Sequence, residues 1–396
     1  MPAESPASFP HLLLVIAAVL ITARILGTLA DKFRQPVILA EVLAGVLLGR
    51  SVFGVLNPDE PVIHALAQLG LLVLLFEIGL GTDLRKLGRV AGTATTVAVA
   101  GVTIPFVIGF FVLDAMGVSR LAAFVGATSL TATSVGVSSR VLADLKRLAT
   151  IEGQVVLGAS VLDDIIGLVL LSIVGSFAAG TVITAAGVVR TSAVAFGFVA
   201  VALLAGYYLV PLIFGALHRH LFASKKIAVT GLAFAFAFAA LAGMLGSAII
   251  VGGFVAGVLL NRVSESDHIE SAAGTMGSLL TPLFFASVGA SVDLAAFREP
   301  RTILITLLLV VIGAAGKVAG GFAPWWFRGN RTLVGVSMIP RGEVELIVAQ
   351  TGLTIGALDA SLFGAITLMV LLTTLLAPPL IQAVARADST SPARWT

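Results

Sequence analysis

The sequence predicts an all-α integral membrane protein with about 13 transmembrane helices, arranged as inverted-topology repeats with two broken, crossing helices. Hydrophobic residues make up 58% of its 396 residues and charged residues 11%, against about 25% charged in ordinary globular proteins. Apolar stretches of roughly 20 residues, enough to span a hydrocarbon core about 30 Å thick, recur along the chain. Because lipid offers the backbone no hydrogen-bond partners, these stretches must be helices.

The apolar stretches also set the expected topology. An odd number of spans places the termini on opposite sides of the membrane, and Lys and Arg favour cytoplasmic loops. One set of loops, with the C-terminal tail, carries 16 Lys and Arg residues, whereas the other carries five. We therefore expect an external N-terminus and a cytoplasmic C-terminus. The expected spans lie near residues 10–30, 36–50, 62–81, 90–113, 118–143, 152–176, 182–214, 226–244, 247–261, 273–290, 302–325, 331–354 and 361–386.

Composition narrows the function classes. The chain has no Cys, which excludes disulfides, thiol catalysis and Fe–S clusters. Its formal net charge of +3 could indicate a nucleic-acid partner, but the excess of Lys and Arg is explained by membrane topology. We expect no nucleic-acid partner, no cofactor and no enzymatic activity.

An internal repeat relates the two halves of the chain. The run Ala44–Arg50 of the second span recurs as Ala256–Arg262 in the ninth, and seven spans separate the two copies, so they are inverted in the membrane. Chance similarity between Gly-rich and Leu-rich helices is the alternative, but a second match lies at nearly the same offset. That match pairs Phe76, Gly79, Asp83 and Leu84 with Ala286, Gly289, Asp293 and Leu294. Inverted repeats are typical of secondary transporters, whose substrate sites lie at the midplane between broken helices.

The fifth and twelfth spans should be counterparts, and each is interrupted midway. The fifth contains the Ser/Thr-rich run 128–136, whose hydroxyls compete for backbone carbonyls. The twelfth contains Pro340, which removes a backbone donor, and Gly342, which relaxes the backbone. A simple kink packed on a neighbour is the alternative for each. A pair of breaks would place backbone carbonyls and half-helix dipoles at the midplane.

Charged residues within spans are functional candidates, because each costs about 2.5–3.5 kcal/mol at a helix centre on insertion scales. Asp163 and Asp164 lie near the middle of the sixth span, and Lys317 lies in the eleventh among small residues that let another helix approach. Consecutive helical residues point about 100° apart, so one carboxylate can pair with Lys317 while the other faces a cavity. Burial and a like-charged neighbour favour the protonated form, whereas Lys317 favours the ionised form. Such a group can exchange a proton for a hard cation; a structural ion pair beside a hydrated carboxylate is the alternative.

Other intramembrane charges carry weaker hypotheses. Arg341 and Glu343 stand at the break of the twelfth span, where they could balance the facing helix dipoles, and a purely structural role is equally compatible. Glu41 and Glu77 are expected to snorkel or to hydrogen-bond a neighbouring helix. Whether Glu41, Glu77 or Glu345 takes part in transport stays open.

Several motifs together resemble the cation:proton antiporter superfamily, in particular NapA-type bacterial electrogenic sodium/proton antiporters. The Asp-Asp pair with the downstream Lys is the specific part, and the resemblance covers nearly the whole chain. Glu345 departs from it, because a small residue is expected there. The motifs are Gln35-Pro36-Val37 through Glu41, Gly45 to Gly49, Leu75 to Leu80, Ala132 to Gly136, Leu162-Asp163-Asp164, Lys317 and Pro340-Arg341-Gly342-Glu343.

The resemblance implies a homodimer in the bacterial inner (cell) membrane that works by an elevator-like motion. Helices near 10–81 and 226–290 would form mainly a dimerisation scaffold, with parts of the third and tenth spans in the core. Helices near 90–176 and 302–386 would form the ion-translocating core, with 182–214 as a linker helix. Asp164 would carry the ion, Asp163 would pair with Lys317, and Thr133 and Ser134 would neighbour the cation. Two acids in the pair favour exchange of two protons for one sodium ion.

Three alternatives remain. The same fold could exchange K⁺ for H⁺, although no C-terminal nucleotide-sensing domain like that of the potassium-efflux relatives is expected. An intramembrane aspartyl protease needs two carboxylates from different helices, whereas Asp163 and Asp164 are consecutive. A passive channel would not need Lys317 matched to one of two carboxylates.

Overall fold

The computed structural model describes residues 9–387 except 34, 36, 83, 179–189, most of 191–223, 246–248, 264–265, 293 and 295–298. Throughout this part the regular structure is helical, and eight of its helices are long and apolar enough to cross a membrane, which confirms the predicted fold class. The span expected near 182–214 falls mostly outside the described residues. The helices are α1 (Phe9–Lys32), α2 (Val37–Leu48), α3 (Pro61–Leu80), α4 (Leu84–Ala115), α5 (Arg120–Thr128), α6 (Val135–Asp144), α7 (Ile151–Ala178), α9 (Ser224–Met244), α10 (Ile249–Leu260), α11 (Ser266–Ala290), α12 (Pro300–Phe322), α13 (Arg331–Ser337), α14 (Glu343–Thr354) and α15 (Ala360–Ala387).

Both predicted interruptions are present. The fifth span is divided into α5 and α6, and the twelfth into α13 and α14, with non-helical residues between the halves. Helices α4 and α11 begin earlier than expected, because polar N-terminal turns continue each helix beyond its apolar stretch. The other described spans match single helices.

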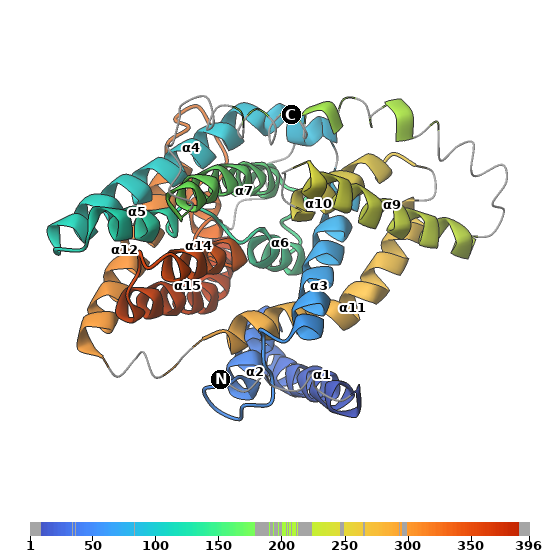
Figure 1. The fold of residues 1–396 in the computed structure, drawn as a ribbon. Helices are drawn as coiled ribbons and strands as arrows, with labels where there is room; N and C mark the ends of the chain where they lie inside the picture. Colours follow the sequence, from blue (N-terminus) through green and yellow to red (C-terminus); the bar gives the residue numbers. More distant parts are fainter. Residues whose placement is uncertain are drawn as a thin grey trace.

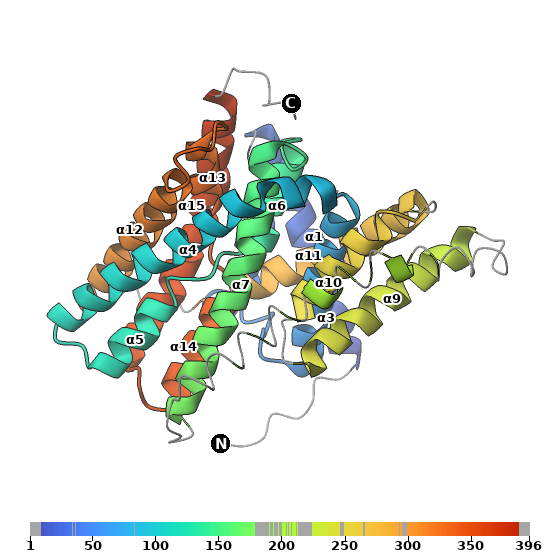
Figure 2. The same ribbon diagram turned by 90° about the horizontal axis from the view of Figure 1, so that it is seen from above.

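The helices pack as two bundles (Figures 1 and 2). We call the group α1, α2, α3, α9, α10 and α11 the first bundle, and the group α4 to α7 with α12 to α15 the second bundle. Within the first bundle, α3 packs against α10 and α11, and α2 against α11 and α1. Within the second, α4 packs against α7 and α12, and α12 against α15. The broken helices therefore belong to one bundle, together with the helices of Asp163 and Lys317.

Close glycine crossings show the repeat in three dimensions. A Cβ atom on Gly45 of α2 would lie 1.9 Å from the carbonyl oxygen of Ala286 in α11. A Cβ atom on Gly257 of α10 would lie 2.2 Å from the carbonyl oxygen of Phe76 in α3. In the predicted repeat, Gly45 corresponds to Gly257 and Ala286 to Phe76. The same glycine-to-carbonyl contact between helices therefore occurs in both copies of the repeat. Only glycine lets two helix backbones approach this closely.

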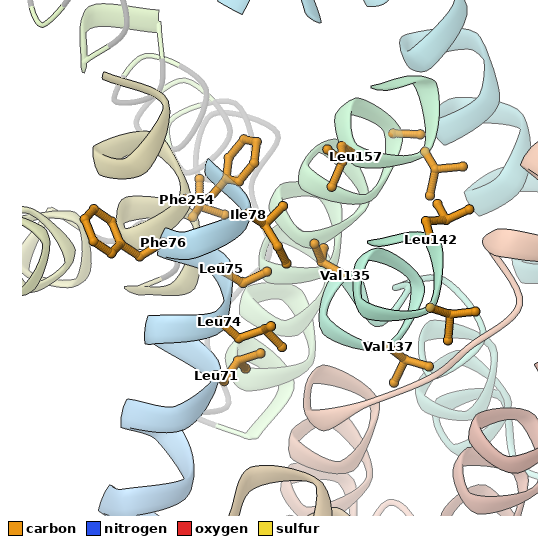
Figure 3. Packing of buried hydrophobic residues seen from close by; sticks show 14 of the residues in the cluster. Leu71, Leu74, Leu75, Phe76, Ile78, Val135, Val137, Leu142, Leu157 and Phe254 are labelled. Carbon is orange, nitrogen blue, oxygen red and sulfur yellow. The ribbon is translucent and has the colours of Figure 1, made fainter. Parts of the chain in front are cut away.

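The two bundles meet over apolar side chains, as Figure 3 shows. Leu71, Leu74 and Leu75 of α3 are directed toward Val135 of α6, and all four are buried. Phe76, next along α3, points away from α6 into the first bundle. This contact lies beside the break that begins α6, so the crossing of the broken helices stands at the boundary between the bundles.

Candidate ion-binding site

The two breaks are joined directly to each other. The backbone N–H of Ser134 donates to the carbonyl oxygen of Pro340 at 2.9 Å, and the Ser138 hydroxyl donates to the carbonyl of Ser337 at 2.6 Å. The Ser134 hydroxyl also accepts from the backbone N–H of Val137 at 3.4 Å and so caps α6. These bonds satisfy backbone groups that the breaks release, which explains how non-helical chain is stable at membrane depth.

Asp163 is held from two sides. Lys317 Nζ lies 2.5 Å from Asp163 Oδ2, and the Thr133 hydroxyl donates to the same oxygen at 2.7 Å. Lys317 Nζ donates a second hydrogen bond to the Thr131 carbonyl at 2.6 Å. The side chains of Asp163 and Lys317 are both 0% exposed. A carboxylate and an ammonium without access to water can stay ionised only when paired in this way.

Small residues on α12 and α4 allow Lys317 to reach Asp163. A Cβ atom on Gly316 of α12 would lie 2.8 Å from the ring of Pro105 in α4, so α12 lies directly against α4. The stem of Lys317 then crosses the face of Gly101, where an added Cβ would lie 3.3 Å from Lys317 Cδ. The flanking small residues that the sequence singled out thus create the path along which Lys317 reaches the broken helix.

Asp164 occupies a different surface of α7. It is 4% exposed and lines a pocket at the crossing, whereas Asp163 is fully buried. The polar part of the lining comes from the two breaks, α7 and the first turn of α14, and the apolar part includes side chains of α3 and α11 in the first bundle. The lining includes Thr133, Ser134, Asp164, Gly342 and Glu345, together with Leu71, Leu75 and Phe284. The pocket therefore offers carboxylate and hydroxyl oxygens, the ligands that hard cations prefer.

The break of the twelfth span carries a second buried charge pair. The Arg341 guanidinium, 0% exposed, donates to the carbonyl oxygen of Ala132 and lies 3.8 Å from Glu345 Oε1. The other carboxylate oxygen of Glu345 accepts the backbone N–H of Gly342 at 2.9 Å, as in half of a capping box. Glu343 begins α14, but its side chain is outside the described residues.

From the sequence, Glu345 was a charged residue at the break of the twelfth span whose part in transport stayed open. The available signal was an acid one turn after a break in an apolar helix, at a position where a small residue was expected. Glu41 and Glu77, whose part in transport was left open, are in α2 and α3 of the first bundle. Among the described residues that line the pocket, neither is present.

Comparisons with known proteins agree with this architecture. A family model described as sodium/hydrogen exchanger, transmembrane, matches residues 16–387. The chain belongs to the sodium/hydrogen exchanger family. It is 31% identical to the high-affinity Na(+)/H(+) antiporter NhaS3 of Synechocystis sp., over 96% of this chain and 91% of the relative. It is 32% identical to the Na(+)/H(+)-K(+) antiporter GerN of Bacillus cereus, over 93% of this chain and 94% of the relative.

Solved structures extend the comparison to three dimensions. The sodium proton antiporter MjNhaP1 of Methanocaldococcus jannaschii at pH 8 superposes with a TM-score of 0.72 at 17% identity, covering 95% of this chain and 99% of that structure. An electron-microscopy map of MjNhaP1 gives a TM-score of 0.77. These likenesses establish the fold. The family is one of ion transporters, which confirms the resemblance drawn from the motifs and the expectation that the chain is not an enzyme.

Proposed function

We propose that this chain exchanges Na⁺, or Li⁺, for H⁺ across the membrane, with Asp164 as the group that carries either ion. The observation that carries the proposal is the asymmetry of the acid pair. Asp163 is fully buried and bound by Lys317 and Thr133, whereas Asp164 lines the pocket at the crossing. The two consecutive carboxylates thus have different environments and can take different roles.

Exchange follows because Na⁺ and H⁺ compete for the carboxylate of Asp164. Ionised Asp164, with the oxygens of Thr133 and Ser134 nearby, can hold a sodium ion; protonated Asp164 cannot. The pocket is partly closed by apolar side chains of the first bundle, including Leu71 and Phe284. Sliding of the second bundle along this apolar surface would carry the pocket from one side of the membrane to the other. This is an elevator-like alternating-access cycle, in which the first bundle provides the dimer contacts of a homodimer.

The Asp163–Lys317 pair supports an electrogenic cycle. If Asp163 and Lys317 together release one proton as Na⁺ binds, and Asp164 releases another, two protons exchange for each sodium ion. One net charge then crosses the membrane, which is worth about 2.3 kcal/mol per 100 mV. In a bacterial inner membrane, with the C-terminus in the cytoplasm as the Lys and Arg distribution favours, membrane voltage would help to expel sodium.

A second candidate is K⁺/H⁺ exchange on the same site. It is favoured by one comparison, since the relative GerN, 32% identical, is named a Na(+)/H(+)-K(+) antiporter. The oxygen ligands of the pocket suit either alkali cation.

Purified protein in liposomes tests both candidates. Internal pH is followed after addition of Na⁺, Li⁺ or K⁺, with and without an imposed potential. We expect Asp164→Asn to abolish cation-dependent proton movement, whereas Asp59→Asn, in an exposed loop with its side chain 73% exposed, should retain it. Exchange that survives in Asp164→Asn would refute the assignment of the carrier. An unchanged pH profile and voltage response in Lys317→Ala would refute the proposed part of the ion pair.

A further inference from the structure

A second carboxylate, Glu345, borders the pocket together with Asp164 and is absent from the mechanism above. Its side chain is 1% exposed and lines the same pocket as Asp164. One oxygen accepts the Gly342 N–H at 2.9 Å. The other, Oε1, is buried, makes no hydrogen bond among the described residues and lies 3.8 Å from Arg341 Nη1. That separation allows charge attraction without a hydrogen bond.

Arg341 needs such a counter-charge. Its guanidinium is fully buried, and the hydrogen bonds described for it go to the uncharged carbonyls of Ala132 and Gly313. Lys317, the other buried cation among the described residues, already has Asp163 at 2.5 Å. Among the described side chains, Glu345 is the acid that forms an ion pair with Arg341.

We propose that Glu345 determines the cation affinity of the pocket lined by Asp164 by cancelling the positive charge of Arg341 at the break of the twelfth span. This inference rests on the proposed cation exchange. In a poorly hydrated pocket, charges act on one another far more strongly than in water. Without Glu345, Arg341 would repel an entering cation and would favour the empty, ionised form of Asp164 over its cation-bound form. Glu345 is thus a positioning residue that acts through charge, in addition to capping α14.

The test separates charge from capping. Glu345→Gln keeps the size of the side chain and an oxygen for the Gly342 N–H but removes the charge. We expect its KM for Na⁺, measured in liposomes at one alkaline pH, to rise at least about tenfold, with the maximal rate changed less than about threefold. Glu152→Gln is the matched control, because Glu152 is also buried at 2% exposure and accepts a backbone N–H, from Asn330 at 3.1 Å, but does not line the pocket. Its KM should stay at the wild-type value.

A rescue variant distinguishes charge balance from local damage. In the double variant Glu345→Gln/Arg341→Gln both charges are removed, so the KM for Na⁺ should return toward the wild-type value. Glu345→Asp keeps the charge and should stay within about threefold of wild type, and it remains informative if Glu345→Gln folds poorly. The Na⁺-dependent rise in unfolding temperature of purified protein gives a readout independent of transport, and it should weaken in Glu345→Gln alone.

Three results would overturn the inference: an unchanged KM in Glu345→Gln, an equal rise in Glu152→Gln, or no recovery in the double variant. Wild-type protein that moves no protons in response to Na⁺, Li⁺ or K⁺ would instead overturn the proposed function. The two failures are therefore distinguishable.

Discussion

Replacing Lys317 by Met should test how strongly the buried ion pair stabilises the fold. Lys317 Nζ lies 2.5 Å from Asp163 Oδ2 and 2.6 Å from the Thr131 carbonyl, and neither charged side chain reaches the surface. Methionine keeps the length of the side chain but leaves Asp163 without its counter-charge. Removing one partner of a buried pair costs about 3–5 kcal/mol, because the remaining charge is left uncompensated. We expect a loss of that size in the free energy of unfolding, measured by titration with a denaturing detergent.

Two further variants make this prediction refutable. In Lys317→Met/Asp163→Asn no buried charge is left alone, so at least about half of the lost stability should return. Arg50→Met removes one partner of an ion pair at 3.0 Å whose side chains are 58% and 73% exposed, and it should cost no more than about 1 kcal/mol. If the double variant is as unstable as Lys317→Met, or if Arg50→Met costs as much, the loss does not come from an uncompensated buried charge.

Two other substitutions test the packing of the repeat and the support of the acid pair. Gly257→Ala places a methyl group 2.2 Å from the Phe76 carbonyl oxygen and should lower the unfolding free energy by about 1–3 kcal/mol or more. Gly92→Ala is the control and should not lower the unfolding free energy, because no atom lies near the added methyl group. Equal effects of the two substitutions would contradict the close crossing of α10 and α3. Thr133→Val removes the hydroxyl that donates to Asp163 at 2.7 Å and should raise the KM for Na⁺ about tenfold in liposomes, while Thr133→Ser should stay near wild type. Equal KM values for Val and Ser would show that the hydroxyl has no part in binding.

Much of the fold could be predicted because lipid restricts the backbone conformations that a spanning segment can adopt. A spanning segment must satisfy its own backbone, so apolar length located the spans that the structure describes. The breaks were predictable because Pro340 and the Ser/Thr run before Gly136 disfavour continuous helix. The starts of α4 and α11 were missed, because their first turns are polar and give no apolar signal.

The candidate site was predictable only in part. Intramembrane charge singled out Asp163, Asp164 and Lys317, since each is costly in lipid. The residues alone left open which carboxylate pairs with Lys317, because that depends on how α7 is rotated against α12. Glu345 was not placed at the site, because its depth and its distance from Arg341 depend on where α14 begins after the break.

By itself, the sequence determined the helical class, the spans among the described residues, the inverted repeat and the charged residues within apolar helices. These follow from local chemistry: the length of apolar segments, the conformational limits of Pro and Gly, and the cost of charge in lipid. Only the tertiary structure decided the pairing of those charges. Helix rotation and the close approach of α12 to α4 at Gly316 bring Lys317 to Asp163 and leave Asp164 at the pocket. Side-chain distances between helices depend on packing, which is a property of the assembled bundle rather than of any one segment.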